Sequence, residues 1–208
     1  MSIIAIIGPD GCGKTTQARL LVDRLNREGY KAIYVNPNYF LINSMFRTKL
    51  HNIFFSPRRN RTNSLKSSRN IIAKARSLLS ALLCYLYALL SRGYMAFVAK
   101  HKIIVCDRYF YQFFFDLFGD WSEVVIKFFP RPDITFFLDG DLELFYSRMR
   151  SSFDATVNKN YYADVLNLYR RLSKKYGFVQ INANLEREKI NELMFRAIKE
   201  KIGARYDE

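Results

Sequence analysis

A glycine-rich segment near the start of the sequence has the pattern of a phosphate-binding loop. Residues 8–15 (GPDGCGKT) match G-x-x-x-x-G-K-[ST] without a mismatch. The glycines let the backbone wrap a phosphate, Lys14 would compensate the charge of the β- and γ-phosphates, and the Thr15 hydroxyl would bind Mg²⁺. We therefore predict ATP and Mg²⁺ as cofactors. The predicted nucleotide-binding residues are Gly8, Asp10, Gly11, Cys12, Gly13, Lys14, Thr15 and Thr16.

A second polar group, Asp107-Arg108-Tyr109, directly follows the apolar run KIIVC. If this run is a strand beside the phosphate-binding loop, Asp107 stands where a carboxylate anchors the water shell of Mg²⁺. The predicted metal site therefore consists of Thr15 and Asp107. The adjacent Arg108 would bind a second phosphate group.

Two basic residues precede a polar stretch in the second half of the chain. Arg148 and Arg150 stand directly before residues 151–160 (SSFDATVNKN). Phosphoryl transfer needs positive charge around the moving group, and a closing loop that carries arginine would supply it and exclude water. A solvated helix face explains the same two residues. The predicted catalytic residues are Lys14, Asp107, Arg148 and Arg150.

These side chains need a scaffold, which alternating apolar and amphipathic segments predict. Strands are expected at Ser2–Ile7, Lys31–Val35, Lys102–Cys106, Asp133–Leu138 and Phe178–Ile181. Helices are expected at Thr15–Glu28, at 69–99 with a candidate break at Arg92-Gly93, within 110–129, and at Leu142–Arg150, Tyr161–Tyr176 and Leu185–Ile202. This alternation predicts an α/β fold, in which a five-stranded parallel sheet has helices on both faces and binds ligands at its carboxyl edge.

Positive charge is concentrated in one part of the chain. The protein has 33 Lys and Arg against 19 Asp and Glu, a net charge of +14. Between Glu28 and Asp107 there is no acidic residue, while thirteen Lys and Arg lie from Lys31 to Lys102. Such a segment attracts anions, which leaves three partners open: a phosphorylated metabolite, nucleic acid or an acidic membrane surface. A basic surface without a single partner is a fourth interpretation.

Length and composition exclude several classes of protein. A chain of 208 residues with 50% hydrophobic residues can form one packed domain, and its 9 Gly and 5 Pro exclude a collagen-like or low-complexity chain. Three widely spaced cysteines without a CxxC pair indicate reduced thiols in a cytoplasmic protein and no zinc site. The apolar stretch Ser77–Ser91 would span about 22 Å as a helix, against roughly 30 Å for a hydrocarbon core, so we predict a buried core helix.

Three motifs together resemble those of a known family. GPDGCGKTTQ, VCDRY and PRPDITFFLD follow one another in the order and spacing of thymidylate kinases, and the similarity runs from Ile3 to about Ile202. The resemblance implies a single P-loop kinase domain over 1–208, with an acceptor-side helical segment at about 38–100 and a lid at about 147–160. It also implies transfer of the γ-phosphoryl group of ATP to a nucleoside monophosphate, with dTMP as the favoured acceptor, and a homodimer.

The resemblance also implies roles for three residues. In thymidylate kinases the acid of the phosphate-binding loop contacts the 3′-hydroxyl of the acceptor sugar, and the matching residue is Asp10. The arginine of the DRY triplet holds the acceptor phosphate, and the matching residue is Arg108. The tyrosine of the triplet crowds the sugar 2′ position, and the matching residue is Tyr109. These three are the expected substrate-binding residues.

The sequence departs from the family pattern where the acceptor base is recognised. The segment after the second expected strand is VNPNYF, without an Arg-Glu-Pro-Gly motif, and the region before DRY contains CYLYALL, without an arginine. Arg69, Arg76 or Arg92 would replace the missing contact, and the spacing selects none of them. A P-loop kinase with a different small acceptor therefore stays open. So does a nucleotide-gated protein that binds nucleic acid or membrane through residues 31–102.

Overall fold

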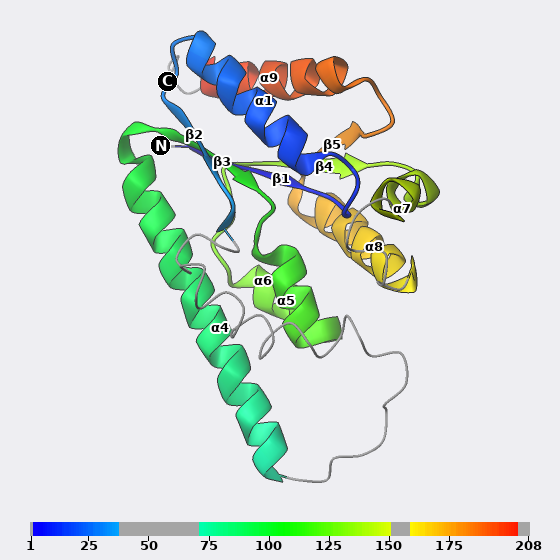
Figure 1. Ribbon diagram of the computed structural model, residues 1–208. Helices are drawn as coiled ribbons and strands as arrows, with labels where there is room; N and C mark the ends of the chain where they lie inside the picture. Colours follow the sequence, from blue (N-terminus) through cyan, green and yellow to red (C-terminus); the bar gives the residue numbers. More distant parts are fainter. Residues whose placement is uncertain (1, 38–70, 151–158, 204–208) are drawn as a thin grey trace.

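The computed structural model of the protein describes residues 2–37, 71–150 and 159–203 (Figure 1). Its helices and strands are, in chain order, β1 (Ser2–Ile7), α1 (Lys14–Arg27), β2 (Ala32–Val35), α4 (Ile71–Val98), β3 (Ile103–Asp107), α5 (Phe110–Phe118), α6 (Ser122–Lys127), β4 (Ile134–Asp139), α7 (Leu142–Arg150), α8 (Lys159–Tyr176), β5 (Val179–Asn182) and α9 (Arg187–Gly203). Two short 3₁₀ turns, η2 (Ala99–His101) and η3 (Gly119–Trp121), precede β3 and α6. Much of the expected acceptor-side segment and of the expected lid lies outside the described residues.

The sheet has the strand order β2-β3-β1-β4-β5, and every pairing is parallel. This confirms the predicted five-stranded parallel sheet. The central strand β1 is apolar on both faces: Ile3 and Ile7 belong to one core cluster, whereas Ile4 and Ile6 belong to the other. Because successive side chains of a strand point to opposite faces, a strand that is covered on both sides needs an uninterrupted apolar run.

Helices cover both faces of this sheet (Figure 1). α1 and α9 pack on one face, where Leu21, Leu25 and Met194 join the cluster of Ile4 and Ile6. α4, α5 and α8 cover the opposite face, where aromatic side chains of α5 pack beneath β1 and β3. The carboxyl ends of β1 and β3, which are paired neighbours, therefore lie between α1 on one side and α5 on the other.

Helix α4 runs without interruption from Ile71 to Val98, so of the two alternatives, one helix or two with a break at Arg92-Gly93, the structure has one helix. A glycine inside a helix costs only about 1 kcal/mol relative to alanine. Burial of residues before and after Gly93 offsets this cost. Ala88 precedes it and Met95 follows it, both on the core-facing side of the helix, and both are 0% exposed. Tertiary packing therefore decides the length of this helix.

Only one side of α4 is buried, which corrects the prediction of a buried core helix at 77–91. Cys84, Ala88 and Ser91 face the core. Six large apolar side chains on the opposite side are between 45% and 74% exposed; this α4 apolar face consists of Leu82, Leu83, Leu86, Leu90, Tyr94 and Phe97. Among residues 2–37, 71–150 and 159–203, no helix has the length and apolar content to cross a membrane.

Candidate active site at the carboxyl edge of the sheet

The predicted phosphate-binding loop lies between β1 and α1, in the strand–loop–helix setting that its motif requires. Gly8 is needed for close packing, because a Cβ there would lie 2.7 Å from the Cys12 sulfur and 2.8 Å from the Leu138 carbonyl oxygen. Gly13 has a φ of 93°, which favours glycine, and forms the N-cap of α1. No side chain caps α1 and its first turn contains no acid, so its first N–H groups are available to a phosphate.

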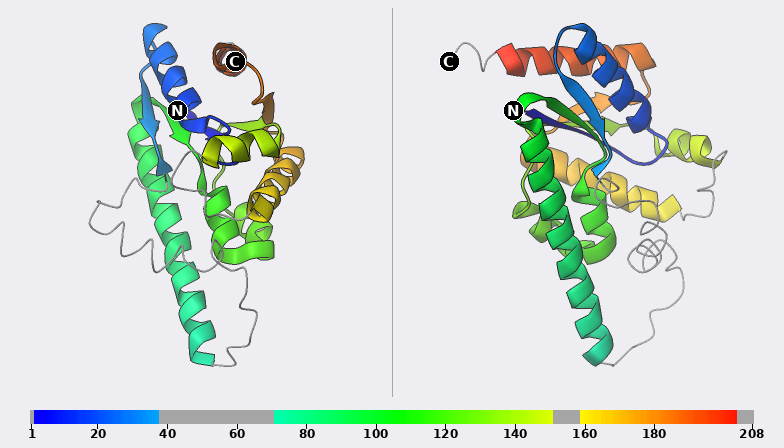
Figure 2. Two further views of the ribbon diagram at one scale, coloured as in Figure 1. Left: turned by 45° about the vertical axis from the view of Figure 1, so that its right-hand side comes forward. Right: turned by 60° about the vertical axis from the view of Figure 1, so that its left-hand side comes forward.

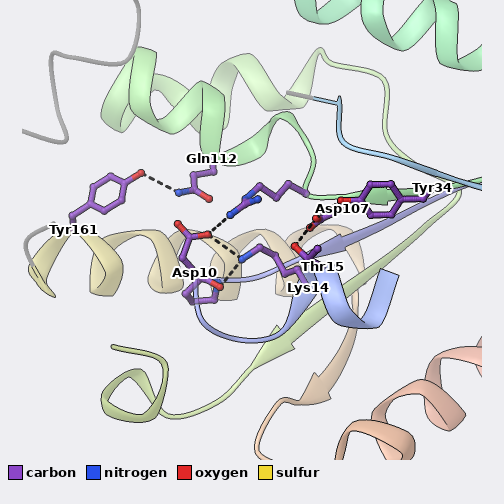
Figure 3. Close-up of polar contacts among 9 residues, drawn as sticks. Asp10, Lys14, Thr15, Tyr34, Asp107, Gln112 and Tyr161 are labelled. Carbon is purple, nitrogen blue, oxygen red and sulfur yellow. Dashed lines mark hydrogen bonds and ion pairs between the residues drawn. The ribbon is translucent and has the colours of Figure 1, made fainter. Parts of the chain in front are cut away.

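Two cations meet on one carboxylate of this loop, that of Asp10 (Figure 3). The Lys14 side chain is 4% exposed, donates to the Pro9 carbonyl oxygen at 2.6 Å and lies 3.3 Å from Asp10 Oδ1. Arg108 Nη2 donates to the same Asp10 oxygen at 2.5 Å. Asp10 therefore connects the lysine of the loop to the arginine that follows β3.

The charges of these three groups reinforce one another. Burial acts to raise the pKa of the Asp10 carboxyl, but the charges of Lys14 and Arg108 outweigh it and hold that pKa well below its usual range. Burial acts to lower the pKa of Arg108, but the Asp10 carboxylate beside it shifts the pKa upward overall. Two cations thus face one anion at neutral pH, which leaves positive charge for a phosphate group.

The Asp107 carboxylate lies at the end of β3, next to the phosphate-binding loop. β3 pairs with β1 so that Asp107 is opposite Ile6, and the Asp107 side chain is buried. Its Oδ2 accepts hydrogen bonds from Thr15 Oγ1 at 2.6 Å and from the Tyr34 hydroxyl at 2.7 Å (Figure 3). Its Oδ1 is buried and has no hydrogen-bond partner within the described ranges.

These atoms fit a magnesium ion. A threonine hydroxyl that donates its proton to a carboxylate keeps its lone pairs for a cation, and the unpartnered Oδ1 of Asp107 is an acceptor that a metal-bound water would satisfy. Thr15 and Asp107 would hold the ion, which neutralises phosphate charge when bound. The described part of the chain contains no group of three or more His, Cys, Asp or Glu side chains placed to hold a metal. Phosphate oxygens and water would therefore complete the coordination shell.

A family model described as thymidylate kinase matches residues 6–194, from β1 into α9. The chain belongs to the thymidylate kinase family. The matched region includes the phosphate-binding loop and the Asp107-Arg108 pair, and membership confirms the resemblance that the three sequence motifs indicated.

Individual members of the thymidylate kinase family align with almost the whole chain. A probable thymidylate kinase 1 of Saccharolobus solfataricus is 27% identical over 206 residues, which cover 95% of each chain. A probable thymidylate kinase of Methanothermobacter thermautotrophicus is 29% identical over 182 residues, which cover 86% of this chain and 85% of that protein. A thymidylate kinase of Ehrlichia ruminantium is 25% identical over 217 aligned positions, which cover 94% and 96% of the two chains.

The structure does not bring Tyr109, the tyrosine of the thymidylate kinase DRY triplet, to this site. Arg108 has a φ of 74°, a left-handed conformation uncommon for a residue with a Cβ, and this turn sends neighbouring side chains in different directions. Arg108 reaches Asp10, whereas Tyr109 enters the core, is 0% exposed and donates its hydroxyl proton to the Pro130 carbonyl oxygen at 2.5 Å. A fully buried ring offers no surface to a sugar.

We expect Tyr109→Phe to lower stability and to leave sugar preference unchanged. The substitution removes the hydrogen bond to the Pro130 carbonyl, and because Pro130 is exposed and its oxygen can bind water instead, the expected loss is that of an ordinary hydrogen bond, about 0.5–1.5 kcal/mol. Thermal unfolding measures the first effect, and competition between dTMP and its ribose counterpart measures the second. If Tyr109→Phe instead changes the sugar preference and leaves stability unchanged, Tyr109 contacts the acceptor sugar.

The predicted arginines of the lid belong to α7, the helix that follows β4. The Arg148 side chain is exposed and interacts with other groups of the protein. The side chain of Arg150 lies outside the described residues, as does the segment 151–158. Beyond that segment, Lys159 at the start of α8 forms an ion pair with Glu143 of α7. The catalytic roles of Arg148 and Arg150 stay predictions.

Arg92 lies away from the phosphate-binding loop. Its guanidinium donates to the Arg131 carbonyl oxygen at 3.5 Å, on the segment that enters β4 at the opposite edge of the sheet. Arg92 therefore does not replace the missing base contact in this structure. Of the other two candidates, Arg69 and the side chain of Arg76 lie outside the described residues.

Cys12 and Thr16 complete the loop in different ways. The Cys12 side chain is 2% exposed beside Gly8, and burial raises the pKa of its thiol. It is a packing residue, and its backbone N–H donates to the Pro9 carbonyl oxygen at 3.4 Å. Thr16 is exposed in the first turn of α1, so its backbone and side chain are both accessible to a nucleotide.

Besides Tyr34, three polar side chains that were not identified from the sequence form a hydrogen-bonded chain between α5 and α8. Gln112 Nε2 of α5 donates to the Tyr161 hydroxyl of α8 at 3.1 Å, and this hydroxyl donates to Asp116 Oδ1 at 2.6 Å. Figure 3 shows Gln112 between Tyr161 and the Asp10 region. A signal existed, because Gln112 and Asp116 are four residues apart in the aromatic run FYQFFFDLF and so share one helix face. No spacing pointed to Tyr161.

Proposed function

We propose that this single kinase domain transfers the γ-phosphoryl group of Mg²⁺-bound ATP to thymidine monophosphate. The observation that carries the proposal is the junction at Asp10, where Lys14 and Arg108 lie 3.3 Å and 2.5 Å from the same carboxylate oxygen. Transfer between two phosphates requires that both be held close together by positive charge, with little covalent chemistry from the protein. Membership in the thymidylate kinase family supports dTMP as the acceptor.

Each residue of the site has one task in this proposal. Lys14 compensates charge on the transferred group, while Thr15 and Asp107 hold Mg²⁺. Arg108 orients the acceptor phosphate. An acceptor phosphate competes with Asp10 for Arg108, and the Asp10 carboxylate then becomes available to the 3′-hydroxyl of the acceptor sugar.

A panel of acceptors tests the proposal. ADP release from Mg·ATP is measured with dTMP, dUMP, UMP, dCMP, dAMP and dGMP, and without any acceptor. We expect the highest kcat/KM with dTMP. Preference for a different acceptor would favour another small-molecule kinase, and slow hydrolysis that no acceptor accelerates would favour a nucleotide-gated binding protein.

We also propose that two copies of the protein pair through the α4 apolar face. α4 lies along one edge of the molecule (Figure 2), and the one charged residue between Leu82 and Phe97, Arg92, is directed to the Arg131 carbonyl oxygen. Exposed apolar patches of this kind mark protein contacts. A two-fold axis would bring the same face of a second copy against it, which buries both faces without opposing like charges.

The double substitution Leu86→Glu with Leu90→Glu is expected to convert the dimer into a monomer, because it would bury opposed carboxylates at the contact. Sedimentation velocity at micromolar concentration measures the change. Leu185→Glu is the matched control, since Leu185 is 41% exposed, close to the 45% of Leu86, but lies between β5 and α9. An unmodified protein that is monomeric, or a double variant that is still dimeric, contradicts the proposal.

A further inference from the structure

Tyr34 lies on β2, the edge strand next to β3, and pairs in register with Val105. Alternate residues of a strand share a face, so Tyr34, Val105 and Asp107 lie on the same side of the sheet. This is the side that α1 covers, and the Tyr34 ring packs against its core cluster. Arg19 of α1 lies over the ring at 5.7 Å from its centre. The tyrosine is thus held by β2 and α1, and its hydroxyl reaches Asp107 at the carboxyl edge (Figure 3).

Two elements hold the same oxygen of Asp107. Thr15 donates to Oδ2 from α1 at 2.6 Å, and Tyr34 donates to it from β2 at 2.7 Å. A carboxylate that accepts only one hydrogen bond, from a hydroxyl that can itself rotate, can change its orientation without breaking that bond. A second donor from a different element restrains the direction of the carboxylate plane, and with it the direction of the unpartnered Oδ1.

We propose that Tyr34 is a positioning residue for the magnesium site. By donating to Oδ2 of Asp107, its phenol keeps the carboxylate in place to accept the hydrogen bond from Thr15 and keeps Oδ1 available to the water shell of the ion. Tyr34 acts through Asp107 and not on the nucleotide itself. The inference rests on the proposed binding of Mg²⁺ and nucleotide at the loop, and it is independent of the acceptor.

The test compares Mg²⁺ binding with nucleotide binding in Tyr34→Phe. Phenylalanine keeps the ring and its contact with Arg19, so the substitution removes only the hydroxyl. Outer-shell partners of metal ligands typically contribute about 10–100-fold in metal affinity, and Tyr34 acts one step further out, through Asp107, so we expect a loss at the lower end of that range, roughly tenfold weaker Mg²⁺ binding to the complex with ADP. Calorimetric titration of Mg²⁺ measures this, and titration of ADP in EDTA should give an unchanged affinity. Tyr30→Phe is the matched control, because Tyr30 is a partly buried tyrosine of the same cluster.

Three outcomes would overturn the inference. The first is an unchanged Mg²⁺ titration in Tyr34→Phe. The second is an equal loss of ADP affinity with and without Mg²⁺, which would indicate damage to the loop. The third is further weakening of Mg²⁺ binding when Tyr34→Phe is added to Asp107→Ala, since a residue that acts through the Asp107 side chain has no effect once that side chain has no oxygen to accept its hydrogen bond. A failed dTMP assay with normal Mg²⁺ and ADP binding would count against the proposed function alone.

Discussion

Lys14→Ala is expected to lower kcat for phosphoryl transfer by about 10²–10³-fold, because it removes a preorganised charge worth about 3–4 kcal/mol at the transition state. The Lys14 ammonium is 4% exposed and is aimed by its hydrogen bond to the Pro9 carbonyl oxygen. A charge that is already in place and shielded from water stabilises developing negative charge more strongly than a mobile surface lysine. Release of ADP in the presence of dTMP measures the effect.

Lys31→Ala is the control for this prediction. Lys31 is exposed and precedes β2, so its removal changes the net charge by the same amount without touching the loop. It should retain normal kcat. Thermal unfolding and circular dichroism establish that Lys14→Ala is folded. Near-normal turnover in that folded variant would remove Lys14 from the catalytic machinery.

Arg108→Asn is expected to lower kcat/KM for dTMP by about 10–100-fold, the equivalent of losing one hydrogen bond between charged groups. It also leaves the Asp10 carboxylate with one cation fewer, opposite an incoming phosphate. Asparagine is chosen because the position has a φ of 74°, a conformation that asparagine tolerates better than most residues. The loss should therefore concern acceptor binding rather than folding.

Measuring ADP binding by Arg108→Asn shows whether the substitution affects the acceptor or the donor nucleotide. We expect the Kd for Mg·ADP to stay within about twofold of the unmodified protein, because Arg108 belongs to the acceptor side of the junction. Arg170→Asn is the matched control, since Arg170 also pairs with an aspartate, Asp139 at the end of β4, at 2.9 Å. If ADP affinity falls as far as kcat/KM for dTMP, Arg108 serves the donor nucleotide.

The phosphate-binding loop, the strands and the parallel sheet could be predicted because each is a local pattern. At position 8 the backbone packs too closely against its neighbours for a Cβ, and at position 13 it adopts a left-handed conformation. Both conditions favour glycine. The uninterrupted apolar run of β1 follows from burial on both faces. Asp107 could be placed near the loop because parallel strands end at the same edge of a sheet.

Contacts between elements distant in sequence were decided by the tertiary structure. The strand order puts β2 beside β3, and this pairing brings Tyr34 into contact with Asp107, which is 73 residues further along the sequence. The left-handed turn at Arg108 sends the arginine to Asp10 and Tyr109 into the core, and no residue type at 108 announces such a turn.

The two sides of α4 show the same division. Its apolar composition was evident from the sequence, but burial depends on which elements pack against it, so one side lies in the core and the other is exposed. Likewise Gly93 indicated a break, and the helix continues because buried side chains before and after it lie on one face. Residue type determines what a segment can bury, and the arrangement of its neighbours determines what it does bury.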